Sequence, residues 1–320
     1  MSMKRKLHAL LAIGLLFRMS SQAGAVRASF LTDDAALQET LEILRSSGCA
    51  GDAIIAFERA VKRYNGSYNG TAFEFDFSKF PQPRLGFFSF ESASRLVSAL
   101  PHRLCDTRHA YDFNCFDTVI VVTAGRLRSG SCIDDIIGPF LVPHTDTNGL
   151  FMVLPAATAR DAFTLAYPSW YRETTESIIP KSMRAGRVCL TAALFRFHVL
   201  PMSTNEDKMS DGVMDALRAS WRHEAVTFSR NFEVVLCHQV NFSRHLFVTA
   251  HAGLLIQGKQ RFIYLEKAGG SGPFVRLDFD NRADLRIWLS AMFKGAEKLG
   301  YTHHFVTFND THIQRIDVGS

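Results

Sequence analysis

Four short apolar segments follow one another in the C-terminal third of the chain, and this pattern limits the fold more than any other feature. They span residues 232–236, 246–256, 261–266 and 274–279. Each segment contains β-branched and aromatic residues, and short polar or glycine-containing stretches separate the segments, which is typical of strands. Such short connections favour antiparallel pairing. We therefore expect an antiparallel sheet, then a helix at about residues 282–293 and a last strand at 305–308.

The N-terminal part of the chain has a helical pattern instead. Between residues 32 and 64, apolar residues such as Leu37, Leu41 and Leu44 recur at helical spacing. Thr32-Asp33-Asp34 can cap the first helix, and Gly48 separates it from a second. Helices followed by an antiparallel sheet indicate an α+β fold class.

The rest of the chain adds no clear second domain. Residues 73–77 alternate like a short strand, and residues 92–230 are expected to be mainly helical, including 92–100 and 209–222. We expect one α+β domain over residues 26–320, with a helical part at about 26–230 and a sheet-rich part at about 231–320.

The first 25 residues resemble a secretory signal peptide. A basic start, Lys4-Arg5-Lys6, precedes an apolar run over residues 7–17, and Ala23-Gly24-Ala25 offers a cleavage site. This run is shorter than the roughly 20 residues that span a bilayer. We expect export to the periplasm or the medium, with no transmembrane segment in the mature chain.

The positive charge belongs mostly to this leader. The formal net charge is +5, and four basic residues and no acidic residue lie within the first 25 positions. The remainder has no excess of basic residues that would favour a nucleic-acid partner. The six cysteines show no Cys-x-x-Cys spacing, and histidines such as His303 and His304 lack metal-ligand spacing. No metal or cofactor is expected, and the disulfide pairing stays open.

Cys115 is the first candidate for chemistry. It follows Asn114 and precedes an apolar run at residues 118–122. If Asn114 or Asp112 caps a helix that starts at about Cys115, the sulfur lies at the positive helix end, which favours the thiolate. Two alternatives stay open: the β-branched run also fits a strand, and a cysteine beside such a run is often a small buried hydrophobe.

A histidine and a carboxylate supply the partners. If the strands at 246–256 and 261–266 fold about the turn at 257–260, His251 lies opposite the neighbourhood of Glu266. The carboxylate can orient one imidazole nitrogen and leave the other to take a thiol proton. A surface pair on a hairpin is the alternative. Together with Cys115, these residues predict a catalytic site.

This order of residues resembles that of papain-like thiol hydrolases. Residues 114–116 are similar to the nucleophile segment of the NlpC/P60 branch, in which a helix opens at the cysteine and a His-x-Gly strand supplies the base. The chain also resembles a family of uncharacterised exported bacterial proteins with a domain of unknown function. That likeness rests on residues 113–115, 251–253, 264–267 and 281–285 and is strongest over 246–293. Phe116 stands where that family has arginine.

The resemblance implies a papain-like, NlpC/P60-like fold and an exported thiol hydrolase. Its substrate would be an amide or peptide bond, such as that of a peptidoglycan stem peptide. Cys115 would be the nucleophile, His251 the general base and then acid, and Glu266 the orienting carboxylate. The Cys115 backbone N–H, with the Asn114 side chain as a weaker second donor, would stabilise the oxyanion. The alternative is an inactive exported binding module on the same fold.

Overall fold

The protein is described by a computed structural model over residues 26–68, 113–130, 137–143, 151–158, 176–194, 197–258, 261–268, 273–293 and 300–317. The expected signal peptide, the strand at 73–77 and the helix at 92–100 lie outside these residues.

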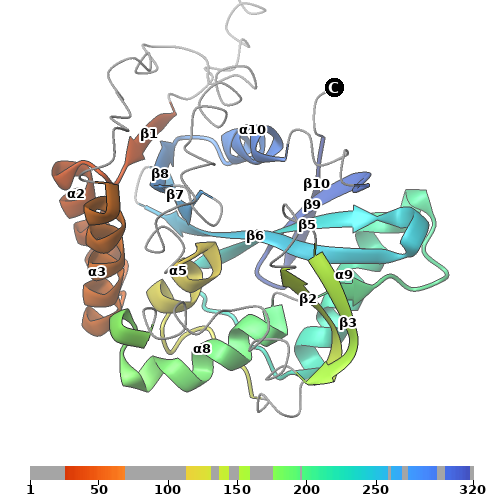
Figure 1. The fold of residues 1–320 in the computed structure, drawn as a ribbon. Coiled ribbons are helices and arrows are strands. Elements are labelled where there is room, and N and C mark those ends of the chain that lie inside the picture. The colour runs from red at the N-terminus through yellow and green to blue at the C-terminus, as the bar shows by residue number, and fades with distance from the viewer. Residues whose placement is uncertain are drawn as a thin grey trace, which may run out of the picture.

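An antiparallel sheet of eight strands organises the described part of the chain (Figure 1). Its order is β1-β8-β7-β6-β5-β9-β10, and β4 pairs with β6. The strands are β1 (Arg27–Phe30), β4 (Phe197–Val199), β5 (Glu233–Asn241), β6 (Leu246–Gln257), β7 (Phe262–Lys267), β8 (Phe274–Phe279), β9 (His303–Phe308) and β10 (His312–Ile316). A separate two-stranded sheet consists of β2 (Ile137–Pro143) and β3 (Phe151–Thr158).

The helices precede most of this sheet in the chain. They are α2 (Asp34–Ser46), α3 (Gly51–Tyr68), α5 (Cys115–Val122), α8 (Lys181–Leu194), α9 (Met209–His223) and α10 (Ala283–Met292), with short 3-10 turns η4 (Glu206–Lys208) and η5 (Phe242–Arg244). The expected α+β class, with helices before an antiparallel sheet, is confirmed. The expectation of a mainly helical middle region is wrong for β2 and β3, and strands β1, β4 and β10 were not predicted.

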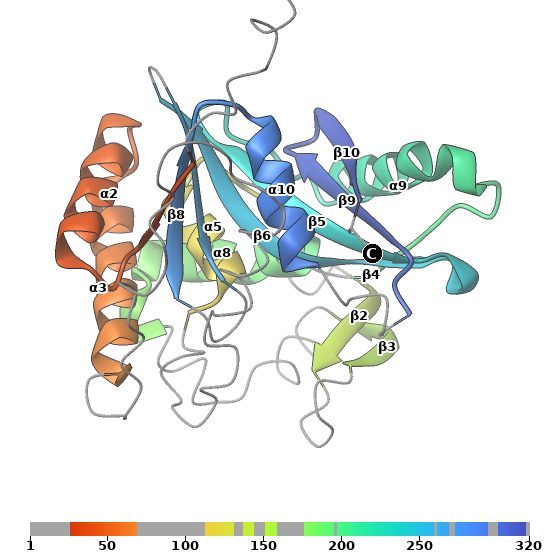
Figure 2. The ribbon, with the colours of Figure 1, turned by 90° about the horizontal axis from the view of Figure 1, so that it is seen from above.

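The two faces of the sheet bury different helices. Along β5, Val234 and Leu236 belong to the larger core cluster with α2, α3, α5, α8 and α9, whereas Val235 and Cys237 belong to a second cluster with α10. This alternation follows from the two-residue side-chain period of a strand. Figures 1 and 2 show α10 on one face and α5 and α8 on the other.

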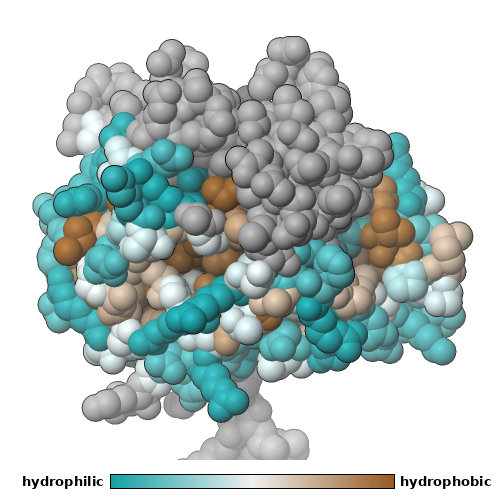
Figure 3. Space-filling model, turned by 90° about the horizontal axis from the view of Figure 1, so that it is seen from below, coloured by the Kyte–Doolittle hydropathy of each residue, from teal (hydrophilic) through white to brown (hydrophobic). Residues whose placement is uncertain are grey.

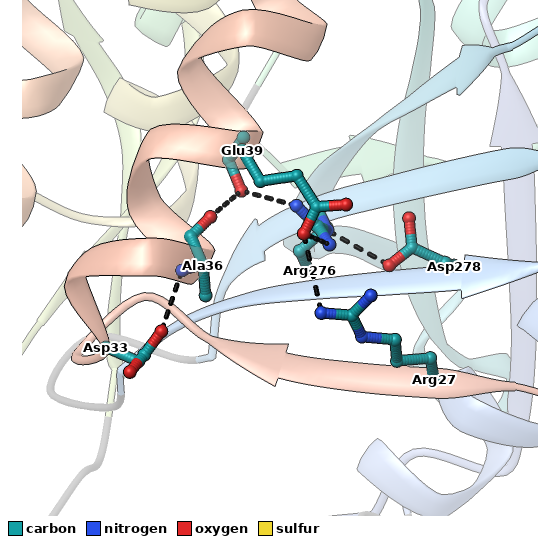
Figure 4. Close-up of polar contacts among 7 residues, drawn as sticks. Arg27, Asp33, Ala36, Glu39, Arg276 and Asp278 are labelled. Carbon is teal, nitrogen blue, oxygen red and sulfur yellow. Dashed lines mark hydrogen bonds and ion pairs between the residues drawn. The ribbon is translucent and has the colours of Figure 1, made fainter.

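A buried arginine joins the N-terminal elements to the sheet. The Arg276 side chain on β8 is fully buried and donates to Glu39 at 2.7 Å, Asp278 at 3.0 Å and Thr40 at 3.1 Å (Figure 4). Arg27 on β1 also reaches Glu39. Because a buried guanidinium requires charged or polar partners, this cluster fixes α2 and β1 against β8.

The described surface has only scattered large apolar residues. Ile55, Val199 and Met202 are exposed, and the view from the α8 side shows apolar areas set among hydrophilic ones (Figure 3). Among the described helices, none combines the length and the apolar character needed to cross a bilayer.

Candidate active site

Cys115 is the first residue of helix α5, and a local hydrogen-bond pattern fixes that start. The Asn114 side chain accepts from the Asp117 backbone N–H at 2.9 Å, and the Asp117 carboxylate accepts from the Asn114 N–H at 3.1 Å. This reciprocal capping box makes Asn114 the N-cap, so the helix begins at Cys115. The expected helix is confirmed, and the strand alternative for residues 118–122 is wrong.

His251 lies at an irregular point of β6. Cys237 pairs with His251 and the next residue of β5 pairs with Thr249, so Ala250 is an extra residue in the ladder. Such bulges re-aim neighbouring side chains and are frequent beside active sites.

β5 pairs with one side of β6, and two strands share the other side. β4 pairs with Leu246–Val248, and β7 pairs with residues 254–257. Residues 249–253, which include His251, therefore lie between the part of β6 that pairs with β4 and the part that pairs with β7. Helix α5 packs against both β6 and β7, which brings its N-terminal cysteine to this part of the sheet.

The three residues predicted for the site lie together. His251 Nε2 is 2.5 Å from Glu266 Oε2, and Cys115 is close enough for its charge and a side-chain hydrogen bond to contribute to the pKa of His251. All three are buried: the exposed fractions are 5% for Cys115, 4% for His251 and 0% for Glu266. The surface-pair alternative for His251 and Glu266 is therefore wrong.

The register differs from the predicted one by two residues. Leu254 pairs with Leu265 and Gln257 with Phe262, which places Glu266 across from Gly253 rather than from His251. The Gly258 N–H donates to the Arg261 carbonyl at 2.8 Å, so the turn closes one residue further along than expected. Glu266 reaches His251 diagonally.

Two further donors hold the Glu266 carboxylate. The Tyr264 hydroxyl donates to Oε2 and the Trp288 indole N–H donates to Oε1, both at 2.8 Å. Tyr264 precedes Glu266 by two residues on the same face of β7, and Trp288 comes from α10. With His251, the buried carboxylate has three partners, which compensate for its loss of water.

The charges of the site favour a protonated histidine. Burial lowers the pKa of His251, but the charges of Glu266 and Cys115 and the hydrogen bonds to both outweigh it and raise the pKa to about 10. Burial and the Glu266 charge raise the pKa of Tyr264 well above its usual value, so the phenol keeps the proton that it donates.

A second thiol lies close by and differs in character. Cys237 is fully buried, and burial, followed by the charges of Glu266 and Cys115, raises its pKa well above the usual value. It therefore stays a neutral thiol. Within the described residues, Cys49, Cys115 and Cys237 are free thiols.

Sequence reasoning missed several residues around the site. Tyr264 and Trp288 were not predicted, and neither was the ion pair between Asp117 on α5 and Arg187 on α8, with Nε and Oδ1 2.6 Å apart. Asp117 had a signal, since an acidic residue three positions after a capping Asn is typical of a capping box. No spacing in the sequence pointed to Arg187.

The expectation that the chain binds no metal or cofactor can be compared with the structure only for the described residues. Within the described ranges, no group of three or more histidine, cysteine, aspartate or glutamate side chains could hold a metal ion. Asn114, predicted as a weaker oxyanion donor, has its side-chain oxygen turned to the Asp117 N–H.

Part of the chain matches a known family model. Residues 193–313 match a family model described as a domain of unknown function (DUF4300). The match agrees with the predicted resemblance to an uncharacterised family. It includes His251 and Glu266, whereas Cys115 precedes it. No curated protein and no solved structure matches the chain.

Proposed function

We propose that this chain is an exported thiol hydrolase of papain-like type that cleaves an amide or peptide bond. The observation that carries the proposal is a buried group of three side chains: Cys115 at a helix N-terminus, His251, whose pKa Cys115 helps to raise, and Glu266, which contacts the imidazole. A nucleophile, a base and a group that orients the base are the parts that covalent acyl transfer requires. Export rests on the leader-like residues 1–25 alone.

The proton positions define the reaction. With His251 protonated and Glu266 on Nε2, the other ring nitrogen, Nδ1, is left to exchange a proton with the thiol. The Cys115 thiolate attacks the carbonyl carbon and forms a tetrahedral oxyanion. His251 gives its proton to the leaving amine as the C–N bond breaks, which leaves a thioester on Cys115. His251 then takes a proton from water, whose oxygen attacks the thioester. The C–S bond breaks, the acid leaves, and the Cys115 thiolate and the protonated His251 are restored.

The oxyanion would meet the start of helix α5. The Cys115 backbone N–H is the first donor, and the positive end of the helix adds to it. The Asn114 side-chain oxygen accepts from the Asp117 N–H at 2.9 Å, and its amide N–H₂ is the group that would be the weaker second donor. A peptidoglycan stem peptide fits an exported amide hydrolase as substrate, and the reaction as written uses no cofactor.

One observation favours the second candidate, an inactive exported binding module. Cys115 and His251 are 5% and 4% exposed, so little of either side chain is open to a substrate. A binding module would retain the fold without thiol reactivity, and this difference separates the two proposals.

The test is the pH dependence of Cys115 alkylation by iodoacetamide, followed by mass spectrometry of each cysteine peptide. We expect a Cys115 rate that stays high well below pH 8.5, the ordinary pKa of a thiol being about 8.5. The His251→Ala variant should lose this reactivity. His238→Ala removes an equally buried histidine of the same sheet and should retain it.

Cys49 is an internal standard in the same experiment. Its thiol donates to the Val122 carbonyl, and burial raises its pKa to about 11, so its alkylation should be slow at neutral pH. A folded protein whose Cys115 reacts no faster than Cys49 near pH 7 would overturn the hydrolase proposal in favour of the binding module.

A further inference from the structure

The Asp117 carboxylate bonds to both Asn114 and Arg187, and the two contacts have different consequences. One oxygen accepts from the Asn114 N–H and so holds the start of α5, and the other accepts from Arg187 Nε at 2.6 Å. Both side chains of the ion pair are nearly inaccessible, with exposed fractions of 3% for Arg187 and 2% for Asp117. Arg187 comes from α8, which packs against α5 (Figure 1).

The cap presents an electrostatic conflict at the nucleophile. Asp117 lies in the first turn of α5, two residues after Cys115. The helix N-terminus favours a thiolate there, but a buried carboxylate in the same turn opposes it, since charges interact strongly away from water. The capping box therefore fixes the position of Cys115 while its charge disfavours the reactive form.

We propose that Arg187 is a positioning residue of the site, which acts through Asp117 by neutralising the capping carboxylate beside the nucleophile. The guanidinium allows Asp117 to hold the helix start without destabilising the Cys115 thiolate. This inference rests on the proposed function, because it assigns Arg187 a role in the reactivity of that thiol.

The experiment measures the pH profile of Cys115 alkylation in the full chain with Arg187→Met. Leaving the Asp117 charge without its Arg187 partner should move the profile about one unit to higher pH, which is a roughly tenfold lower rate at pH 6. Arg187→Lys keeps the charge and should restore most of the wild-type profile. The double variant Asp117→Asn with Arg187→Met removes both charges, retains an amide oxygen for the cap, and should also return the profile towards wild type.

Arg276→Met is the matched control. It removes an arginine that is equally buried and ion-paired but belongs to the contact between β8 and α2. It should lower stability and leave the alkylation profile in place. If Arg187→Met is too unstable to measure, the double variant and Asp117→Asn remain, and neither should move the profile to higher pH.

The outcomes separate the two proposals. If Cys115 of the wild type is alkylated with the pH dependence of an ordinary thiol, the hydrolase proposal itself is rejected. A reactive wild-type Cys115 with the same profile in folded Arg187→Met would reject the role of Arg187 alone. A shift in Arg187→Met that the double variant does not reverse would assign the effect to lost packing rather than to charge, and would also reject it.

Discussion

Tyr264 occupies the space in which a side chain at Gly253 would lie. A Cβ at Gly253 would be 2.2 Å from the Tyr264 hydroxyl oxygen and 2.3 Å from the ring carbon that bears it. The missing side chain on β6 thus leaves the space in which the Tyr264 phenol lies while its hydroxyl donates to Glu266. The glycine of the His-x-Gly sequence is part of the site geometry.

Gly253→Ala should therefore displace Tyr264 and weaken its hydrogen bond to Glu266. Overpacking of this kind costs about 1–3 kcal/mol of unfolding free energy, measured by urea denaturation. Gly186→Ala is the control, because a Cβ there meets nothing within 4 Å, and in a helix it should be stabilising by up to about 1 kcal/mol. Equal stability and equal Cys115 alkylation in Gly253→Ala and wild type would contradict the interpretation.

The Trp288 indole tests how firmly Glu266 is held. Trp288→Phe removes the N–H that donates to Oε1, and a hydrogen bond to a charged group contributes about 1.5–3 kcal/mol. Trp221→Phe is the matched control. The Trp221 indole is also buried, and its N–H has no hydrogen-bond partner among the described residues.

Both tryptophan variants lose the same volume, so their difference in unfolding free energy reports the hydrogen bond. Trp288→Phe should be the more destabilised and should also slow Cys115 alkylation. Equal losses in the two variants would mean that packing, and not the bond to Glu266, is the contribution of Trp288.

The Arg276 cluster should make stability depend on pH in the acid range. The hydrogen bond and charge of Arg276 outweigh burial and lower the pKa of Glu39 below 4.5. A depressed folded-state pKa gives stability that is present above pH 4.5 and is lost as pH falls through the folded-state value. The unfolding free energy of wild type should exceed that of Glu39→Gln at pH 7, and the gap should close in acid.

Glu42→Gln provides the comparison for Glu39→Gln on the same helix. Glu42 pairs with Arg45 on an exposed surface, where ion pairs contribute little. A constant difference between wild type and Glu39→Gln from pH 7 to pH 3 would show that the Glu39–Arg276 contact does not titrate as expected.

The parts that could be predicted are those that local sequence determines. The helix start at Cys115 follows from Asn114 and Asp117, which bond within one turn. The β6–β7 hairpin follows from two apolar runs about a short turn, and only its register was wrong, because the Gly258–Arg261 contact sets where the ladder begins. A two-residue shift keeps side chains on the same face, so His251 and Glu266 still meet.

The parts that could not be predicted depend on contacts between distant segments. Arg187 reaches Asp117 across 70 positions, and Arg276 reaches Glu39 across 237. Strand β1 has only four residues, too few for a two-residue period to be recognised. No spacing rule links such positions, since packing of whole helices and strands brings them together.

Two buried histidines on adjacent strands should titrate in opposite directions. His251 bonds to Glu266, and its pKa is raised to about 10. His238 lies 2.9 Å from the Thr307 hydroxyl and 3.2 Å from that of Thr249, and burial lowers its pKa to about 3. Neutral hydroxyls do not stabilise an imidazolium as the Glu266 carboxylate does. The pKa of His238 is therefore determined by burial, which favours the neutral ring.

Nitrogen chemical shifts of the two imidazoles, followed by NMR from pH 5 to pH 9, test this contrast. His251 should remain an imidazolium and His238 a neutral ring over the whole range. Glu266→Gln removes the charge that contributes most to raising the pKa of His251 against the effect of burial. His251 should then titrate at a lower pH or become neutral, while His238 should not change. A neutral His251 at pH 7 in wild type would contradict the thiolate–imidazolium pair, because the proton needed for the leaving amine would not be on the ring.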